Sequence, residues 1–181
     1  MIQTSFYSEK ELLSLGFKSI GKGCRISRKA CFYDINKITI GNNVRIDDFC
    51  ILSGNITLGS NIHISAYVAL YGSKGIIMED YTGVSARTTI YSAMDDFSGN
   101  YLIGPIHPEE TTNVLGGAVV ISKFSQIGAH CVIMPSIVLE EGTVIGAFSL
   151  VRHSTRSWSI YYGSPAHYVR NRSQEMKKLV Y

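Results

Sequence analysis

An aliphatic residue recurs at every sixth position through two long parts of the chain. All thirteen positions hold Ile, Leu or Val: Ile40, Ile46, Leu52, Leu58, Ile64, Leu70 and Ile76, then Ile121, Ile127, Ile133, Leu139, Ile145 and Val151. A period of six fits neither an α-helix nor one alternating strand, and it is typical of repeat architectures. Gly, Asn, Asp and Ser fill the positions between the apolar ones, so each repeat predicts a short strand followed by a turn.

Stacked coils satisfy such a pattern. Coils that lie on one another pair their strands in parallel, so that each interior backbone group finds a partner and the aliphatic residues form one buried column. The two end coils then need covers. The capping-box residues Ser8 and Glu11, followed by leucines and Gly16, predict a short helix within a cap segment 1–19, and a tail 157–181 is expected to cover the other end with a second short helix.

Between them we expect one repeat domain over residues 20–156. Its six-residue period slips by two residues after Ile38 and again after Ile76, and a corner or a bulge must absorb the slip. A segment at about 92–117 interrupts the period with glycines, prolines and acids. A long loop without the repeat inside a strict repeat is usually functional.

The composition argues against several other classes of protein. The 181 residues are 45% hydrophobic and 17% charged, which fits one folded domain rather than a disordered chain. A net charge of +3 without a basic stripe disfavours nucleic acid. Without an apolar run of membrane length or a signal peptide at residues 1–4, we expect no membrane insertion and a cytoplasmic protein. The four cysteines lack CxxC spacing and are expected to be buried, reduced and structural.

The repeat, its interrupting loop and the ending Gly163-Ser164-Pro165-Ala166 resemble those of the hexapeptide-repeat acyltransferases over about residues 20–170. The resemblance implies an all-β fold, a left-handed parallel β-helix with an extended loop and short terminal helices. It also implies a homotrimer that binds acetyl-CoA between neighbouring subunits. Within the family, the loop and tail look most like the branch of galactoside, maltose and surface-polysaccharide acetyltransferases.

In that branch a His-Pro pair in the loop carries the catalytic histidine, and the matching pair here is His107-Pro108. An imidazole with a pKa near neutrality can remove a proton from a sugar hydroxyl or amine as it attacks the thioester. The acyl group would then pass directly from CoA to the acceptor. Without the repeat and the proline, His107 would be interpreted as an exposed loop residue.

The resemblance also implies a set of cofactor contacts. Small residues beside the pantetheine arm fall on Ala129 and Ala147, and the groups for the phosphates and adenine fall on basic residues after the last coil and in the tail. The latter are Arg152, His153, His167 and Arg170. A solvated basic face is the alternative. Trp158 either stacks on adenine or packs the end of the coil, while His63 and His130 are expected at turn-side positions with structural roles.

The acceptor site departs from the galactoside and maltose enzymes, because the stretch that would hold their asparagine contains none. It holds Tyr67 and Tyr71, which are candidate substrate contacts together with the loop acids Asp95 and Asp96. Carboxylates there can bind sugar hydroxyls or an ammonium group, or merely keep the loop soluble.

The leading hypothesis is therefore an acetyl-CoA-dependent acetyltransferase that acts on a sugar or nucleotide-linked amino sugar of bacterial surface polysaccharide. By resemblance, dTDP-4-amino-4,6-dideoxyglucose is a candidate acceptor, and O-acetylation of galactosides or polysaccharide hydroxyls is the alternative. A zinc enzyme of the γ-carbonic anhydrase type needs three convergent histidines, two of them five residues apart, and the five histidines here lack that spacing, so no metal is expected. A non-catalytic β-helix assembly module is a third possibility, disfavoured by the loop histidine and the tail.

Overall fold

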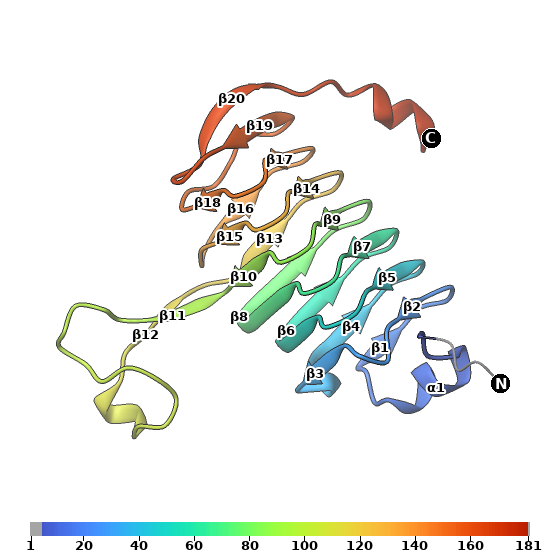
Figure 1. The fold of residues 1–181 in the computed structure, drawn as a ribbon. Helices are drawn as coiled ribbons and strands as arrows, with labels where there is room; N and C mark the ends of the chain where they lie inside the picture. The colour runs from blue at the N-terminus through green and yellow to red at the C-terminus, as the bar shows by residue number, and fades with distance from the viewer. Residues whose placement is uncertain (1–4, 181) are drawn as a thin grey trace.

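The computed structural model describes residues 5–180, which form a parallel β-helix with three faces (Figure 1). Face 1 consists of β1 (Ser19–Ile20), β4 (Ile38–Ile40), the second halves of β6 (Ile51–Leu58) and β8 (Ala69–Met78), β13 (Val119–Ile121) and β16 (Val138–Leu139). Face 2 consists of β2 (Arg25–Ile26), β5 (Val44–Ile46), β7 (Ile62–Ile64), β9 (Gly83–Val84), β14 (Gln126–Ile127), β17 (Val144–Ile145) and β19 (Ser159–Tyr162). Face 3 consists of β3 (Cys31–Tyr33), the first halves of β6 and β8, β10 (Thr89–Tyr91), β15 (Val132–Ile133) and β18 (Leu150–Val151).

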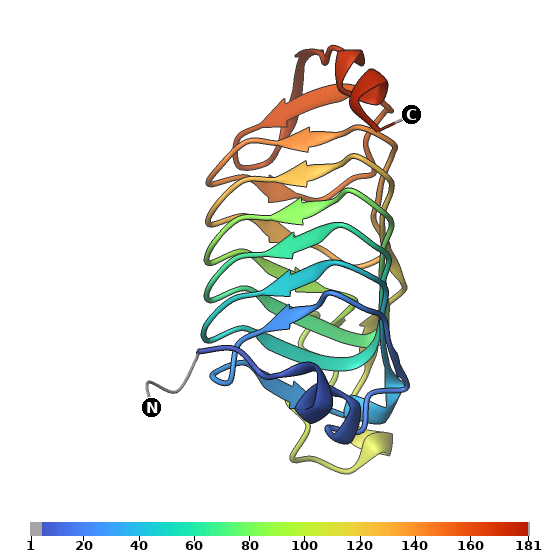
Figure 2. The same cartoon turned by 90° about the vertical axis from the view of Figure 1, so that its right-hand side faces the viewer.

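The expected fold class is confirmed. Strands of successive coils pair in parallel and in register, as when Arg45 pairs with His63 eighteen residues further on. Figure 2 shows the strands of the near face running from right to left while the chain climbs, which is the left-handed sense of winding.

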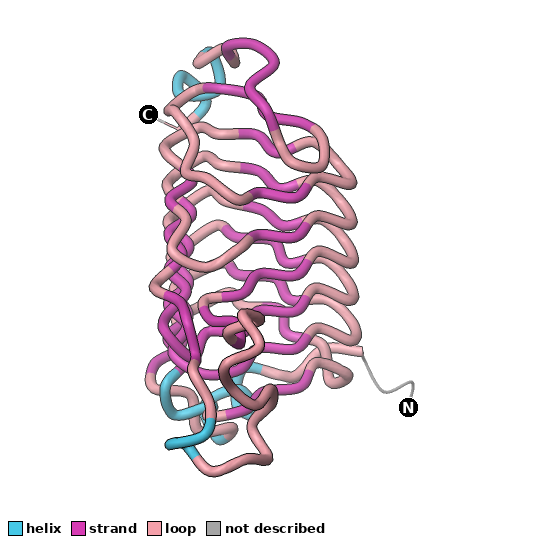
Figure 3. Tube along the Cα trace, turned by 90° about the vertical axis from the view of Figure 1, so that its left-hand side faces the viewer, coloured by secondary structure: helices cyan, strands magenta, loops and turns pink. Residues whose placement is uncertain are grey.

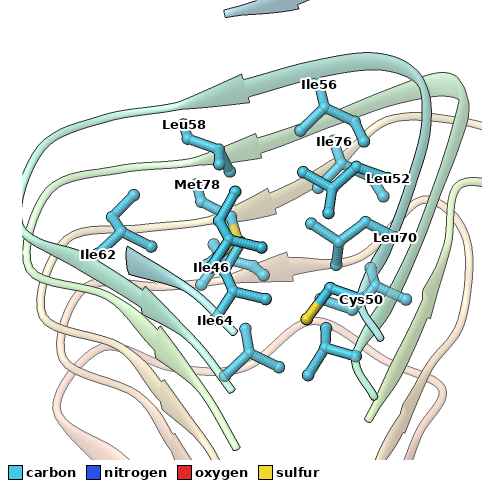
Figure 4. Close-up of a cluster of buried hydrophobic side chains, with 14 of the residues drawn as sticks. Ile46, Cys50, Leu52, Ile56, Leu58, Ile62, Ile64, Leu70, Ile76 and Met78 are labelled. Carbon is cyan, nitrogen blue, oxygen red and sulfur yellow. The ribbon is translucent and has the colours of Figure 1, made fainter. Parts of the chain in front are cut away.

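The six-residue period marks the core. All thirteen aliphatic positions are at most 2% exposed. Figure 4 shows six of these side chains packed together with Cys50 and Ile62 inside the coil: Ile46, Leu52, Leu58, Ile64, Leu70 and Ile76. Buried aliphatic side chains of this size each contribute about 1.5–3 kcal/mol relative to exposure, so this column is the main source of stability.

Both slips of the period are longer corners. The first is filled by Asp34 in the left-handed region (φ 54°) and the 3-10 turn η1 (Ile35–Lys37). The second is the Gly72–Gly75 corner inside β8, two residues longer than the corresponding Gly54-Asn55 corner inside β6. The strands that follow re-enter the ladder with Ile76 and Met78 both buried.

Both ends are covered. Helix α1 (Glu9–Ser14) starts with the expected capping box between Ser8 and Glu11, and residues 1–4 of the predicted cap segment lie outside the described residues. At the other end, β20 (His167–Asn171) folds back antiparallel on β19, and the chain finishes in the 3-10 helix η3 (Glu175–Leu179). The expected terminal helix is therefore present as a 3-10 helix.

The interrupting loop leaves the coil after β10 and stands away from it (Figure 1), so that in Figure 3 it lies in front of the coil. Its base is an antiparallel ribbon of β11 (Ala93–Asp95) and β12 (Val114–Gly116), and it carries the 3-10 turn η2 (Glu109–Thr111). The buried Ser92 fixes its start, because its hydroxyl donates to the Tyr71 carbonyl at 3.0 Å and accepts from the Lys74 amide at 2.9 Å.

The cysteine expectation is right for three of the four residues. Cys24, Cys50 and Cys131 are buried, and burial raises the pKa of the Cys50 thiol to about 11. Cys31 is exposed, contrary to expectation, because it precedes the inward residue Phe32 on β3 and therefore faces outward. Among the described residues, no helix is both long and apolar enough to cross a membrane.

Candidate active site

A column of small residues runs along the corner between faces 2 and 3. We call the pairs Ser65-Ala66, Ser85-Ala86, Gly128-Ala129 and Gly146-Ala147 the small-residue column. Backbone hydrogen bonds hold successive coils together there: the Ser85 amide donates to the Ile127 carbonyl at 2.8 Å, and the Gly128 amide to the Ile145 carbonyl at 2.7 Å. A Cβ at Gly128 would lie 2.5 Å from the Ala147 nitrogen. Glycine is required there by the close approach of the next coil, and an extended arm can lie along the exposed backbone.

Beside this column, face 2 is hollow. Its outward row runs through Arg45, His63, Gly83 and Gln126 on neighbouring strands. Gly83 supplies no side chain, so the Gln126 amide lies against its backbone, and a cavity of about 440 Å³ opens beside them. We call this cavity the face-2 hollow. Its walls include His63, Ser65, Ser85, Gln126 and Met176, so the column and the hollow share Ser65 and Ser85.

One wall of the hollow carries a hydrogen-bonded polar group. Asp47 Oδ2 lies 2.8 Å from His63 Nε2, and Asp47 Oδ1 accepts from Arg45 Nε at 2.7 Å. Burial opposes ionisation of the Asp47 carboxyl, but the hydrogen bonds from His63 and Arg45 outweigh it and hold its pKa below the usual value. His63 thus lies in a strand and not at the turn-side position expected from the sequence.

The two loop acids differ in their surroundings. Asp96 accepts from the Ser98 amide and from Asn113 Nδ2, each at 2.8 Å, and these bonds lower the pKa of its carboxyl. Asp96 therefore organises the loop itself. Asp95 pairs with Val114 through its backbone, and within residues 5–180 its carboxylate has no hydrogen bond or ion pair. Of the two, Asp95 is available to a ligand.

His107 lies in the projecting part of the loop, just before η2. Its ring is half-buried, and among the described residues it makes no hydrogen bond or ion pair. The loop stands away from the coil of its own chain (Figure 1), so one chain does not bring His107 to the small-residue column.

The predicted cofactor residues fall into separate groups. Ala129 and Ala147 lie together in the small-residue column, and His167 and Arg170 lie exposed on β20 at the end of the coil. Arg152 lies at the base of the loop instead, in a shallow cleft with Met94 and Leu115 at the corner between faces 3 and 1. The neighbouring residue His153 is exposed.

The two tyrosines predicted to contact the substrate, Tyr67 and Tyr71, lie at different corners of the coil. Tyr67 stacks on Phe49 with ring centroids 4.9 Å apart at the corner between faces 2 and 3, and the Arg87 guanidinium lies 4.5 Å from its ring centre. Tyr71 stacks instead on Tyr91 at the far edge of face 3. They do not line one site in a single chain.

Trp158 packs the end of the coil, the second of the two expected roles. It is 8% exposed, lies tilted against Phe124 and covers Gly142, where a Cβ would meet the indole at 2.5 Å. The tail folds over its other side through Arg172 and Lys177. His130 stacks on Phe148 at a corner, with ring centroids 4.8 Å apart.

Among residues 5–180, no three His, Cys, Asp or Glu side chains lie close enough to hold a metal ion. The polar groups gathered around the hollow are instead hydrogen-bonding and acid–base groups. Ser85 and the Asp47–His63 pair were missed by sequence reasoning. A serine at a corner looks like an ordinary turn residue, and the paired side chains lie sixteen residues apart.

Comparisons with known proteins point to one family of enzymes. No family model matches the sequence. The chain is 39% identical over 178 residues to the Escherichia coli dTDP-4-amino-4,6-dideoxy-D-glucose acyltransferase, covering 97% of this chain and 93% of that protein. Its fold superposes with a TM-score of 0.95 on AntD, an N-acyltransferase from Bacillus cereus, at 49% identity over 98% of this chain and 95% of that one. A hexapeptide-repeat acetyltransferase from Vibrio cholerae, VCA0836, shares the fold at 18% identity, 92% and 82% coverage and a TM-score of 0.62.

Two AntD structures contain dTDP-4-amino-4,6-dideoxyglucose with CoA, and another contains dTDP with 3-hydroxybutyryl-CoA. The AntD structures include variants of one serine and of one aspartate ten positions further along that chain. Ser85 and Asp95 have the same separation here. The likeness to both relatives spans nearly the whole chain, and the protein belongs to the hexapeptide-repeat acyltransferases, in the family of the E. coli dTDP-4-amino-4,6-dideoxy-D-glucose acyltransferase.

Proposed function

We propose that the protein transfers an acyl group from acyl-CoA to the amino group of dTDP-4-amino-4,6-dideoxyglucose. The relatives named above support this acceptor, and AntD supports CoA as the donor. The observation that carries the proposal is the position of Ser85, where a column fit for a pantetheine arm opens into a hollow fit for a sugar.

The donor lies along the column. Pantetheine runs past Ala147 and Ala129 with its amides on the exposed backbone, and the thioester ends beside Ser85. The basic groups at the end of the coil, His167 and Arg170, then hold the CoA phosphates. His153 and Arg152 are further candidates for these phosphates, with Arg152 acting on a neighbouring subunit, since it lies on the other corner of its own chain.

The acceptor lies in the face-2 hollow with its amino group at Ser85. The serine hydroxyl orients this group, and the free carboxylate of Asp95 binds it as an ammonium. Ser85 precedes β10 and Asp95 follows it, so that a strand of face 3 separates them in one chain. We therefore place the active site between two subunits of a homotrimer, with Ser85 from one and Asp95 from the next.

N-transfer fits this site better than O-transfer. A carboxylate without a partner attracts a cation, and an amine is a stronger nucleophile than a hydroxyl once it loses its extra proton. His107, on the same projecting loop as Asp95, would also reach the neighbouring subunit and remains the base that the family resemblance implies. Nucleotide sugars and CoA are metabolites of the cytoplasm, where we place the reaction.

The test is a transfer assay read by mass spectrometry. Purified protein is offered acetyl-CoA or 3-hydroxybutyryl-CoA with dTDP-4-amino-4,6-dideoxyglucose, and with the matched dTDP-6-deoxyglucose that carries a hydroxyl at C4. The proposal expects acylation of the amino sugar only, and the preferred acyl-CoA identifies the donor. Acylation of the hydroxyl sugar at an equal rate, or of neither sugar with either donor, would overturn it.

A further inference from the structure

The Asp47–His63 pair opens onto the face-2 hollow without a part in the reaction described so far. We propose that His63, held by Asp47, is the base that removes the extra proton from the acceptor's ammonium group, in place of the loop histidine His107 that the family resemblance implies. The inference rests on the proposed function, because it takes the hollow as the acceptor site.

The hydrogen bonds fix the tautomer of the ring. An ionised carboxylate only accepts hydrogen bonds, so His63 Nε2, 2.8 Å from Asp47 Oδ2, must carry the hydrogen of neutral imidazole. Nδ1 then has a free lone pair, and no residue in the described part of the chain donates to it. The Arg45 guanidinium, bonded to the other oxygen of Asp47, keeps the carboxylate ionised and fixed in place.

The position of His63 suits the acceptor's amine. His63 pairs with Gly83 on the next strand, and Ser85 lies two residues beyond Gly83 on the same side. One strand spacing and two residue rises put the Cα atoms of His63 and Ser85 roughly 8 Å apart, within reach of a sugar amine between their side chains.

Few charges face the imidazole. The strand on one side supplies Arg45, with Asp47 directly after it, and these are the charged residues of the polar group. The strands on the other side supply Gly83 and Gln126, the corner before β9 supplies the phenol of Tyr81, and the tail supplies Met176. None of these is a carboxylate or a cation. The other charges near the ring would then be the ammonium group and diphosphate of the bound acceptor and the Asp95 carboxylate of the neighbouring subunit.

The proton balance needs one base besides the CoA sulfur. His63 Nδ1 takes one proton from the ammonium and leaves a neutral amine. The amine nitrogen bonds to the thioester carbonyl carbon, the C–S bond breaks, and the departing sulfur takes the second N–H proton to give CoASH. His63 then releases its proton to solvent, so that one proton is released for each amide formed.

A purely structural pair would behave differently. His63 and Asp47 form one partly exposed pair, and pairs of this kind contribute little to stability. His63→Gln can still donate to Asp47 but cannot take a proton. Asp47→Asn leaves one acceptor oxygen for the two donors, and with that oxygen on Arg45 the new NH2 group faces His63 Nε2 and no longer fixes the tautomer.

The experiment measures kcat/KM of the intact enzyme against pH for wild type, His63→Gln, Asp47→Asn and the control Asp34→Asn, which lies on another corner beside Lys37. At pH 7 we expect losses of about 100-fold for His63→Gln and about 10-fold for Asp47→Asn, with no change for the control. The defect of His63→Gln should shrink at high pH, where the amine is already neutral.

Melting temperature and affinity for dTDP, measured on the same variants, should stay at wild-type values. A wild-type pH profile for His63→Gln, or a loss that is constant over the whole pH range, would overturn the inference while the proposed function stands. An inactive wild type would instead overturn the proposed function and the inference with it.

Discussion

Replacing Arg172 by alanine tests how the tail is fastened to the coil and whether it shapes the acceptor site. Its Nη1 donates to the carbonyl oxygens of Phe124 and Gly142 at 2.7 and 3.0 Å, and its backbone amide donates to the Trp158 carbonyl at 2.7 Å. Its Nη2 lies 3.2 Å from the sulfur of Met176, which lines the face-2 hollow. One side chain thus ties the last coil, the tail and the hollow together.

The cost of the change follows from those contacts. Each hydrogen bond from a charged donor is worth about 1.5–3 kcal/mol, and the partial exposure of Arg172 reduces that value, so the two bonds together contribute about 3 kcal/mol. The loss falls on the tail, because the coil below has its own ladder and aliphatic column. A loss of about 3 kcal/mol makes the fraction of molecules with a detached tail roughly 100-fold larger in the variant than in the wild type.

Hydrogen exchange measured by mass spectrometry resolves this. Amides of residues 172–180 should exchange about 100-fold faster in Arg172→Ala, whereas those of the central coils keep the wild-type rate. Arg170→Ala, an exposed position on β20 just before Arg172, is the matched control and should leave exchange unchanged. The acceptor KM should also rise, because Met176 no longer forms a fixed wall. Unchanged exchange in the tail, or equal acceleration in both variants, would refute this account of Arg172.

Four further predictions concern the site and the surface. Ser85→Ala and Asp95→Ala should each lose most activity. Mixed trimers from co-expression of the two variants should recover about a quarter of the wild-type rate, since one site in four receives both native residues. No recovery would place both residues in one subunit. His107→Ala should keep the trimer and CoA binding, and its kcat decides between the two histidines: a large loss supports the loop base, a small one supports His63. Arg170→Ala should weaken CoA binding without changing the acceptor KM, and calorimetry showing unchanged CoA affinity would contradict the phosphate role. In the native protein, a thiol reagent should label Cys31 alone; labelling of a second cysteine would contradict the burial of the other three.

The buried core was predictable because the six-residue period of the sequence equals the length of one side of a coil. A coil of three six-residue sides returns each inward position to the same place, and the thirteen aliphatic residues are all buried for that reason. The two slips were visible as well, since an insertion at a corner shifts every later position. Only their form, a 3-10 turn in one case and Gly72–Gly75 in the other, required the structure.

The site was less predictable because its residues are neighbours only across coils of unequal length. Arg45 and His63 are eighteen residues apart, one regular coil. His63 and Gly83 are twenty apart, because of the longer corner, and Gly83 and Gln126 are forty-three apart, because the loop intervenes. An outward glycine in a repeat looks like any turn glycine until the residues above and below it are known.

The hollow arises where this regular fold departs from its own pattern. Gly83 omits one outward side chain, the inserted loop carries Asp95 away from its own coil, and the returning tail places Met176 over the gap. None of these three features supplies a residue to the aliphatic column, which the inward residues of the coils form by themselves. Substitutions at His63, Ser85 or Asp95 should therefore leave the coil folded, and a loss of activity in those variants reports on the chemistry of the site rather than on stability. The same separation lets members of one fold family change acceptor while the coil stays the same.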